Sequence, residues 1–266
     1  MAACLLAIAA FLSLAMTLAW AVAICSGKSG FIDATWSLAV GIAGIAAALW
    51  PLGGGEYGPR RWLIAGFAAI WSARLGLYIL GRSLGAEDDP RYAKLKAEWG
   101  ENAPRQLLIF LQIQSVAGWP LAGAALLAAH APFTAFRLQD GLAVIVFVAA
   151  FIGETLADRQ MAFFRANPKN HGGICEDGLW AWSRHPNYFF EWLGWVAYAV
   201  AAVDLSGGYP QGWLSLAAPA VMYGLLVYVS GVPPLEEYLR RTRPAAFAEY
   251  ARRVSVFWPL PPARRI

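Results

Sequence analysis

Long apolar segments, each close to the length that crosses a lipid bilayer, follow one another along most of this sequence. A spanning helix needs about 20 mostly apolar residues, because the hydrocarbon core is roughly 30 Å thick and a helix rises about 1.5 Å per residue. Lipid offers no partner to an unpaired backbone amide, so such segments can only be helices. About seven segments qualify by length: Ala3–Cys25, Asp33–Leu52, Trp62–Gly81, Leu107–His130, Gly141–Asp158, Pro186–Val203 and Trp213–Val232. The sequence therefore predicts an all-α, polytopic integral membrane protein.

The composition agrees with a membrane protein. Hydrophobic residues make up 59% of the chain and charged residues 14%, whereas a soluble domain usually carries about 25% charged residues. The three cysteines, Cys4, Cys25 and Cys175, form no CxxC and no metal-binding spacing, which argues against a disulfide framework and against a metal site. With no internal repeat and no low-complexity segment, we expect a single membrane domain over residues 1–266, which includes a basic cytosolic tail over residues 234–266.

Basic residues predict the orientation of the chain in the membrane. If the N-terminus lies outside, the inward loops and the tail hold 17 lysines and arginines, and the outward loops hold only Arg60, Arg61 and Arg137. Lysine and arginine are enriched on the cytoplasmic side of membrane proteins. We therefore expect a multi-pass membrane protein with the N-terminus outside and the C-terminus in the cytosol. Its basic loops fit anionic lipid headgroups rather than nucleic acid.

Ionisable side chains within spanning helices are costly, so each one is a candidate functional residue. Glu154 and Asp158 are four residues apart and share a helix face. Arg165 follows Glu154 by about three turns and returns to that face if the helix continues beyond the membrane. A second stripe at helical spacing begins the next helix and consists of Arg184, Asn187, Tyr188 and Glu191. By the predicted topology, both stripes lie near the cytosolic side and indicate a site open to the cytosol.

The chemistry of these residues fits a nucleotide. Arginines and lysines around the loop between the two stripes suit phosphate groups, and Asn187 with the carboxylates suits ribose hydroxyls or a carboxamide. The sequence has no GxGxxG motif after a strand and no Walker motif. A dinucleotide would therefore have to be held by the membrane helices and their loops.

Structural roles compete with each of these interpretations. Asp33 also fits the N-cap of the second helix, and Arg74 can extend its side chain to the lipid headgroups. The two polar stripes also fit a network of hydrogen bonds between helices that binds no ligand.

The segment Gly173–Trp192, which reads GICEDGLWAWSRHPNYFFEW, resembles the C-terminal signature of the steroid 5α-reductase superfamily, and most closely its bacterial DUF1295 branch. Other segments similar to that branch are Asp33–Trp36, Trp71–Tyr78, Glu87–Tyr92, Glu154–Gln160 and Gly231–Tyr250. The resemblance implies a membrane-embedded oxidoreductase that transfers hydride from NADPH to an electron-poor carbon–carbon double bond. Its substrate would be a lipophilic small molecule, steroid-like or isoprenoid-like.

The same resemblance implies the residues that bind the cofactor. Family residues with this role fall on Asp158, Arg165, Asn187 and Glu191, and a tail tyrosine of the family falls near Tyr238. Neighbouring residues of the same motifs complete the candidate set: Arg184, His185, Tyr188 and Tyr250.

The catalytic residues follow the family pattern less closely. In the steroid reductases, a tyrosine on an early helix, assisted by a carboxylate, donates a hydrogen bond to the enone carbonyl. Aligning Arg74 and Tyr78 with the family's arginine and tyrosine leaves Trp71 at the position of that catalytic tyrosine. Because an indole cannot act as a proton donor near neutral pH, the candidate catalytic residues are Tyr78, Asp33 and Arg74. Otherwise the substrate and the chemistry differ from steroid reduction.

Two other classes of function remain open. Membrane methyltransferases of the isoprenylcysteine and phospholipid type share the RHPxY core, and their tails resemble Pro234–Tyr238 and Tyr250 of this chain. They use S-adenosylmethionine, whose sulfonium needs aromatic or carboxylate neighbours rather than several arginines. The other alternative is a non-enzymatic membrane protein whose polar stripes only join helices.

The predicted orientation can be tested with reporter fusions. A reporter that is active only in the periplasm should stay inactive when fused after Ile266 and should be active when inserted near Gly54, because the basic loops lie on the cytosolic side. Fusions assayed in intact bacteria give the answer. The reverse pattern of activity would contradict the orientation.

Overall fold

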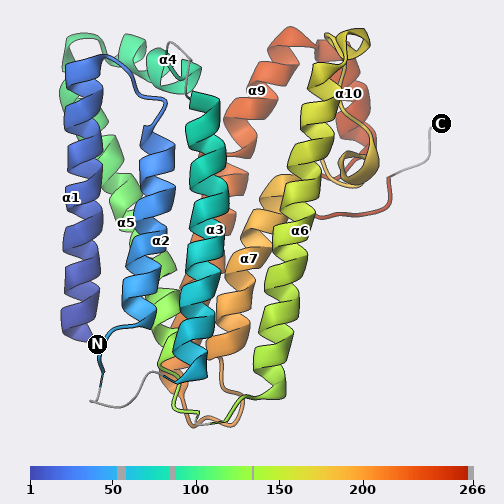
Figure 1. Ribbon diagram of the computed structural model, residues 1–266. Coiled ribbons are helices and arrows are strands. Elements are labelled where there is room, and N and C mark those ends of the chain that lie inside the picture. Colours follow the sequence, from blue (N-terminus) through green and yellow to red (C-terminus); the bar gives the residue numbers. More distant parts are fainter. Residues whose placement is uncertain (53–57, 84–87, 134, 263–266) are drawn as a thin grey trace. The chain divides into compact units, whose positions relative to one another are not determined.

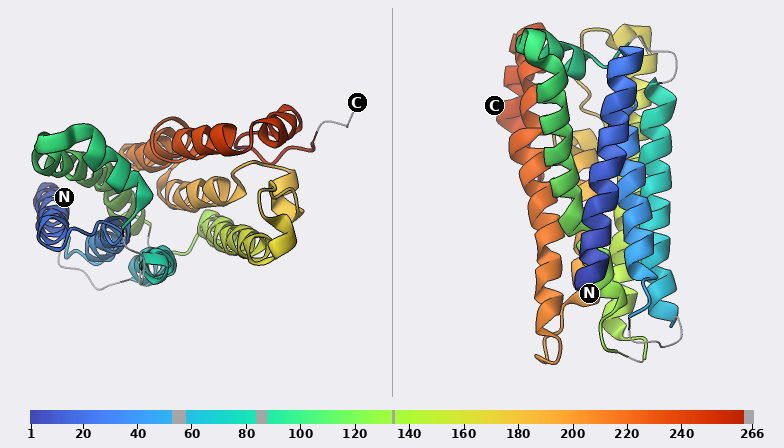
Figure 2. Two further views of the ribbon diagram at one scale, coloured as in Figure 1. Left: turned by 90° about the horizontal axis from the view of Figure 1, so that it is seen from above. Right: turned by 90° about the vertical axis from the view of Figure 1, so that its left-hand side faces the viewer.

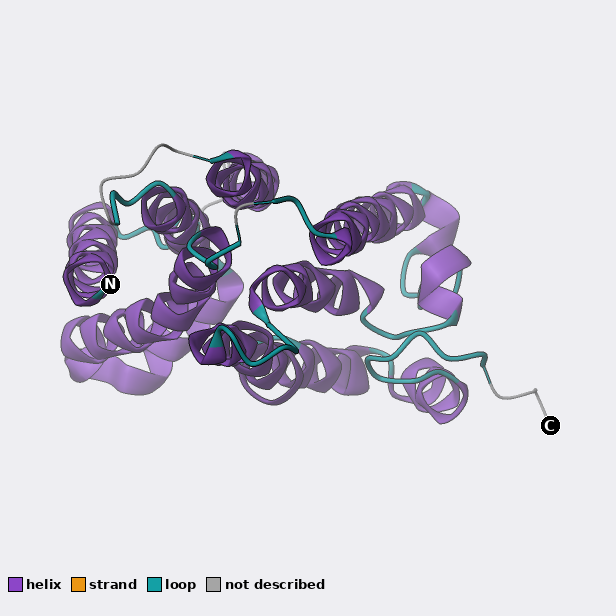
Figure 3. Cartoon of the chain, turned by 90° about the horizontal axis from the view of Figure 1, so that it is seen from below, coloured by secondary structure: helices purple, strands orange, loops and turns teal. Residues whose placement is uncertain are grey.

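Helices make up all the regular structure in the described residues of the computed structural model, which are 1–52, 58–83, 88–133 and 135–262 (Figures 1 and 3). The long helices are α1 (Ala2–Ser26), α2 (Ile32–Ala48), α3 (Pro59–Ser83), α5 (Ala103–Ala129), α6 (Leu138–Ala166) and α7 (Pro186–Ala202). The shorter ones are α4 (Pro90–Trp99), α8 (Ala217–Gly224), α9 (Val232–Thr242) and α10 (Pro244–Arg253). Gly54, Glu87 of the Glu87–Tyr92 motif, and residues 263–266 of the predicted tail lie outside the described residues.

Five helical stretches are long and apolar enough to cross a membrane: Ala2–Ser26, Pro59–Gly81, Arg91–Ala129, Leu138–Ala166 and Pro210–Thr242. Two further helices, α2 and α7, have 17 residues each. The predictions of a helical fold and of a multi-pass membrane protein are therefore confirmed. The count of about seven spans and the orientation of the chain stay predictions.

Helix α6 is longer than the sequence predicted. The predicted segment ended at Asp158, but the helix continues to Ala166 and therefore includes Arg165. Helix α2, by contrast, ends at Ala48 rather than at Leu52. The segment predicted over Trp213–Val232 is irregular, because a 3₁₀ turn precedes α8 and a π-helical turn over Leu225–Val229 follows it.

The chain divides into two compact units, of which the first comprises residues 1–136 and 201–218. In this unit α2 packs against α1, α3 and α5, and α1 also packs against α5 (Figure 2). Small residues allow the close contacts, since a Cβ atom on Gly41 of α2 would overlap the side chain of Ser72 on α3. Small residues have the same role in many membrane helix pairs. Helix α4 lies at the end of this unit where α1 ends and α2 begins (Figure 1).

The second unit comprises residues 137–200 and 219–266 and contains α6, most of α7, α9 and α10. A Cβ atom on Gly153 of α6 would overlap the ring of Phe190 on α7, so this glycine lets the two helices approach. The loop between these helices is fixed to α6, because the indole of Trp180 donates to the carbonyl of Ala157 at 3.0 Å. This loop carries the SRHP sequence to the start of α7.

Gly153 can be tested against a second glycine of the same helix. Gly153→Ala should lower the thermal unfolding temperature of the detergent-purified protein, because overpacking a tight contact typically costs about 1–3 kcal/mol. Gly141→Ala is the control, since a Cβ atom there meets nothing within 4 Å. Alanine at Gly141 should leave the unfolding temperature unchanged or raise it. Equal effects of the two changes would contradict the close contact between Gly153 and Phe190.

Candidate functional site

The first polar network lies in unit 1, where α1 ends and α2 begins. Gly27 adopts a positive φ of 72°, and its amide bonds to the carbonyl of Ala23, which ends α1. Helix α2 then starts at Ile32 with Phe31 at the N-cap, and no side chain caps it. Asp33 therefore lies in the first turn of α2 and is not the N-cap residue, so its carboxylate is available for contacts with other helices.

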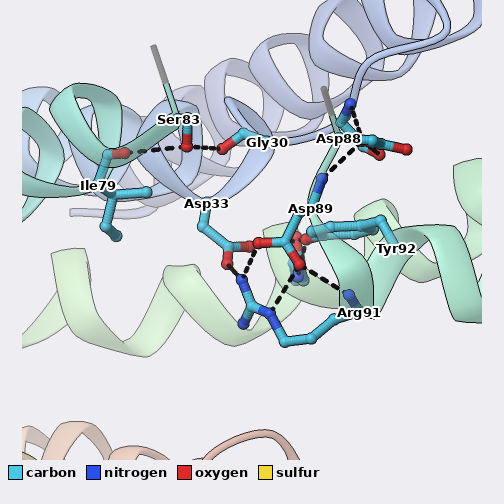
Figure 4. Close-up of polar contacts among 10 residues, drawn as sticks. Gly30, Asp33, Ile79, Ser83, Asp88, Asp89, Arg91 and Tyr92 are labelled. Carbon is cyan, nitrogen blue, oxygen red and sulfur yellow. Dashed lines mark hydrogen bonds and ion pairs between the residues drawn. The ribbon is translucent and has the colours of Figure 1, made fainter. Parts of the chain in front are cut away.

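Asp33 contacts two residues of α4 (Figure 4). The guanidinium of Arg91 donates to its Oδ2 at 2.6 Å, and the hydroxyl of Tyr92 donates to its Oδ1 at 2.7 Å. Asp89 caps α4, because its carboxylate accepts from the amide of Arg91 at 2.9 Å and from the guanidinium at 2.8 Å. Since the cap fixes the first turn of α4, it holds Arg91 and Tyr92 against Asp33.

Gln114 of α5 extends this network. Its side-chain amide donates to the hydroxyl oxygen of Tyr92 at 3.2 Å, and its backbone carbonyl accepts from the indole of Trp36 at 2.8 Å. Tyr92 is only 3% exposed and packs with aromatic residues that include Phe110. The polar end of Tyr92 is thus the point at which residues from α2, α4 and α5 meet.

A second carboxylate fixes the loop between α1 and α2. Asp88 accepts from the amide and hydroxyl of Ser29 at 2.7 and 2.6 Å, and from the ammonium of Lys96 at 2.7 Å. Burial by itself would raise the pKa of Asp88, but the hydrogen bonds from Lys96 and Ser29 outweigh it and lower this pKa to about 2. Asp88 is therefore ionised throughout the physiological range and joins α4 to the loop.

The other two catalytic candidates lie on α3. Tyr78 on α3 is 47% exposed, and Arg74, one turn before it, is partly buried. Trp71 is 6% exposed and meets Trp36 edge to face, with 6.5 Å between the ring centroids. Asp33, by contrast, is held by side chains of α4.

The second polar network lies in unit 2 and centres on Glu236 of α9, which is 3% exposed. Its carboxylate accepts from Arg184 at 2.8 Å, from His185 Nε2 at 3.2 Å and from Arg240 at 2.9 Å. Two of these partners belong to the SRHP sequence. Glu236 therefore joins the start of α7 to the tail.

His185 is buried and keeps one nitrogen unused. An ionised carboxylate only accepts hydrogen bonds, so the Nε2 atom that faces Glu236 carries the hydrogen, and Nδ1 of the neutral ring is an acceptor. Burial lowers the pKa of His185, although Glu236 acts in the opposite direction, and the ring is neutral near pH 7. Nδ1 is buried with no hydrogen-bond partner in the described part of the chain. The imidazole stacks on Tyr188, with 5.3 Å between the ring centroids.

The two predicted stripes contact each other through Asn187 and Asp158. The side-chain amide of Asn187 donates to Asp158 Oδ1 at 3.4 Å, which links α7 to α6. Glu191 is buried and accepts from the indole of Trp195 at 3.1 Å, and Glu154 is also buried. Arg165 lies on α6 as the spacing required, and its side chain is exposed.

Three other predicted cofactor residues differ in their surroundings. Arg184 also donates to the carbonyls of Ala251 and Val254, at 3.0 and 2.9 Å, so its guanidinium fixes the tail. Tyr250 is 2% exposed and donates to the carbonyl of Trp180 at 2.6 Å; its burial raises the pKa of its hydroxyl. Tyr238 is 57% exposed.

Sequence analysis assigned no role to Tyr92, Arg91, Gln114 or Glu236. Their signals were present but indirect. Tyr92 and Arg91 belong to the Glu87–Tyr92 segment and Glu236 to the tail segment, both of which carried family resemblance. No sequence pattern indicated Gln114, because a single glutamine in an apolar helix does not by itself indicate a function.

Comparisons with known proteins agree with this resemblance in part. The family described as "Protein of unknown function (DUF1295)" matches residues 19–254, which include both polar networks. The chain is also 24% identical over 273 residues to the uncharacterized protein C594.04c of Schizosaccharomyces pombe, which covers 90% of this chain and 75% of that protein. No solved structure matches the chain.

The role of Glu236 can be tested by removing its carboxylate. Glu236→Ala should destabilise the protein strongly, because loss of one partner from a buried charge network typically costs about 3–5 kcal/mol. The neighbouring Glu237 is exposed, so Glu237→Ala should change stability by less than about 0.5 kcal/mol. Thermal unfolding in detergent compares the two variants. Similar unfolding temperatures would show that Glu236 does not hold the tail.

Proposed function

This chain belongs to the DUF1295 family, and we propose that it is a membrane-embedded reductase. It uses NADPH to reduce an activated carbon–carbon double bond in a lipophilic, steroid-like or isoprenoid-like substrate. The reaction adds a hydride to one carbon of the double bond and a proton to the other. This assignment also rests on the resemblance of Gly173–Trp192 to the steroid 5α-reductase superfamily.

The observation that carries the proposal is the 2.7 Å hydrogen bond between Tyr92 and Asp33. The steroid reductases use a tyrosine assisted by a carboxylate, and the sequence offered only Trp71 at the aligned position. Tyr92 supplies such a tyrosine from α4, and Asp33 supplies the carboxylate from α2. In this proposal Tyr92, rather than Tyr78, contacts the substrate.

Tyr92 and Asp33 of unit 1 fit a direct role in the proposed reduction. Reduction of an enone places negative charge on the carbonyl oxygen, and a hydrogen-bond donor positioned there stabilises that charge. Tyr92 has a single hydroxyl proton, which points to Asp33 in the structure. In the proposed complex the Tyr92 hydroxyl turns this proton to the carbonyl oxygen of the substrate and moves away from Asp33 Oδ1, because two acceptors facing each other at 2.7 Å would repel. Asp33 then keeps its ion pair with Arg91, at 2.6 Å, so its carboxylate is not left uncompensated.

The residues of unit 2 fit a dinucleotide. NADPH, when bound, supplies the hydride. Asn187 and Asp158 offer a donor and an acceptor for hydroxyl or carboxamide groups, and His185 Nδ1 offers a buried acceptor that no protein donor uses. Exposed Arg165 and Lys169 suit the phosphates. Arg184 fits this role less well than the sequence indicated, because Glu236 and two backbone carbonyls already engage its guanidinium.

A methyltransferase that uses S-adenosylmethionine is the second candidate. A sulfonium is stabilised by aromatic faces, and unit 2 contains a cluster of aromatic rings. Trp192 and Trp258 have ring centroids 5.2 Å apart, and Tyr223 and Phe257 lie at the same separation. The reductase is favoured, because the tyrosine–carboxylate pair of unit 1 has no part in methyl transfer.

Thermal stabilisation by cofactors separates these two functions. Ligand binding to the folded state stabilises it by RT ln(1 + [L]/Kd). We expect NADPH to raise the unfolding temperature of the purified protein, NADH to raise it less, and S-adenosylmethionine to leave it unchanged. Asn187→Ala should weaken NADPH binding about ten- to hundredfold, the effect of losing a hydrogen bond worth about 1.5–3 kcal/mol.

Asn102→Ala is the matched control, since Asn102 is exposed and its side chain makes no capping hydrogen bond at the start of α5. Its affinity for NADPH should equal that of the wild-type protein. Stabilisation by S-adenosylmethionine alone would replace the reductase assignment with the methyltransferase.

A further inference from the structure

Gln114 carries a polar atom that the protein itself does not use. Its amide nitrogen donates to Tyr92 and its backbone carbonyl accepts from Trp36. Its side-chain oxygen, Oε1, is buried and has no hydrogen-bond partner within the described residues. Gln114 lies on α5, within a helical stretch that is apolar enough to cross a membrane. A buried amide oxygen without a partner loses its hydration and gains nothing in return.

The hydrogen-bond network fixes which end of the amide is left over. Asp33 is a carboxylate and can only accept, so the single proton of the Tyr92 hydroxyl goes to Asp33. The Tyr92 oxygen can then only accept from Gln114, which requires the nitrogen of that amide to face it. Turning the amide around would set two acceptors against each other at 3.2 Å. Oε1 of Gln114 is therefore the end of the amide that has no hydrogen-bond partner among the described residues.

A neighbouring glutamine shows that this chain satisfies such amides elsewhere. Gln112 lies two residues before Gln114 on α5. Its oxygen accepts from the hydroxyl of Ser13 at 2.7 Å, and its nitrogen donates to the hydroxyl of Thr17 at 3.0 Å. The two hydroxyls come from α1, so a small polar residue on an adjacent helix is enough to complete the bonding. Among the described residues, none donates a hydrogen bond to Gln114 Oε1.

We propose that Gln114 Oε1 accepts a hydrogen bond from a hydroxyl group at the polar end of the lipophilic substrate. This inference rests on the proposed function, because it places the substrate carbonyl at Tyr92. Gln114 contacts the Tyr92 hydroxyl through its nitrogen, so its oxygen lies within the width of one amide group from that contact. The substrate hydroxyl is thus close to the carbonyl in the molecule. The substrate class is a lipophilic hydroxy-enone.

The specificity follows from the chemistry of the two ends of this network. The Tyr92 hydroxyl selects substrates that carry a hydrogen-bond acceptor, and Gln114 Oε1 selects substrates that carry a hydrogen-bond donor. An analogue without a donor leaves the buried oxygen unpaired, and sites that hydrogen-bond a substrate hydroxyl reject such analogues. Gln114 is therefore a specificity-determining residue, whereas Tyr92 acts on the reacting group.

The test uses two probes with one carbon skeleton. The first is a dodecyl cyclohexenone with a hydroxyl on the carbon next to the carbonyl, and the second is its methyl ether, which lacks the donor. Binding to purified protein in detergent is measured by tryptophan fluorescence without added cofactor. Wild-type protein should bind the hydroxyl probe about tenfold more tightly than the ether, as expected for one hydrogen bond. Gln114→Leu should bind both probes with equal, weak affinity.

Gln112→Leu is the matched control, because it removes an amide from the same helix whose two ends are already satisfied. It should keep the preference for the hydroxyl probe even though its fold is less stable. Gln114→Met, which has a similar length, repeats the test if Gln114→Leu does not fold. Equal binding of the two probes by wild-type protein, binding of neither, or a preference that persists without Gln114 would overturn the inference.

The cofactor titration distinguishes this inference from the function on which it rests. Gln114→Leu should keep the full stabilisation by NADPH, since Gln114 is not among the residues assigned to the cofactor. Absence of NADPH stabilisation in wild-type protein would contradict the reductase. The preference between the two probes would still be decided by the fluorescence binding measurement.

Discussion

The hydrocarbon core of a membrane offers neither donor nor acceptor to a polar group, so each backbone amide of a spanning segment must be paired within the protein. This requirement explains why the described residues form helices and only one isolated strand-like pairing, between Ser183 and Ser255. The same requirement applies to polar side chains. A carboxylate or guanidinium at the membrane boundary needs a partner of its own, and the chain provides one through contacts between distant segments.

Both polar networks are built in the same way around one carboxylate. Asp33 receives hydrogen bonds from Arg91 and Tyr92, and Glu236 receives them from Arg184, His185 and Arg240. In each network a helix start fixes the donors: the Asp89 cap orients Arg91 and Tyr92, and Ser183 accepts from the amide of His185 ahead of α7. A carboxylate so placed joins helices and, at the same time, orients a tyrosine or a histidine, which the proposed function assigns to ligand binding.

Each network also leaves one buried acceptor without a protein partner, His185 Nδ1 in unit 2 and Gln114 Oε1 in unit 1. Unpaired buried acceptors lower stability, so each one needs an explanation, such as a catalytic role or a bound water or ion. A neighbouring amide of the same helix is fully paired, since Gln112 bonds to Ser13 and Thr17. The two unused acceptors therefore direct attention to a cofactor at one network and to a substrate hydroxyl at the other.

Hydropathy and local spacing were sufficient to predict much of the architecture. The apolar segments fell on helices, because the tendency to leave water depends on composition over about 20 residues and not on neighbours far along the chain. The spacing of Glu154, Asp158 and Arg165 placed them on one helix face, and α6 includes all three. Asp33 and Asn187 were also identified from their positions within apolar segments.

Only the tertiary structure decided which polar groups meet. Asp33 and Tyr92 are 59 residues apart, and Arg184 and Glu236 are 52 apart, so no local pattern links them. The roles of single residues changed accordingly: Arg184 fixes the tail and Tyr250 donates to a backbone carbonyl. In the proposed function, Tyr92 takes the place that the sequence offered to Tyr78. The sequence determined that these side chains must find partners, because an unpaired charge is costly near lipid. The packing of the helices chose the partners, because a hydrogen bond forms only between atoms that the fold brings within about 3 Å.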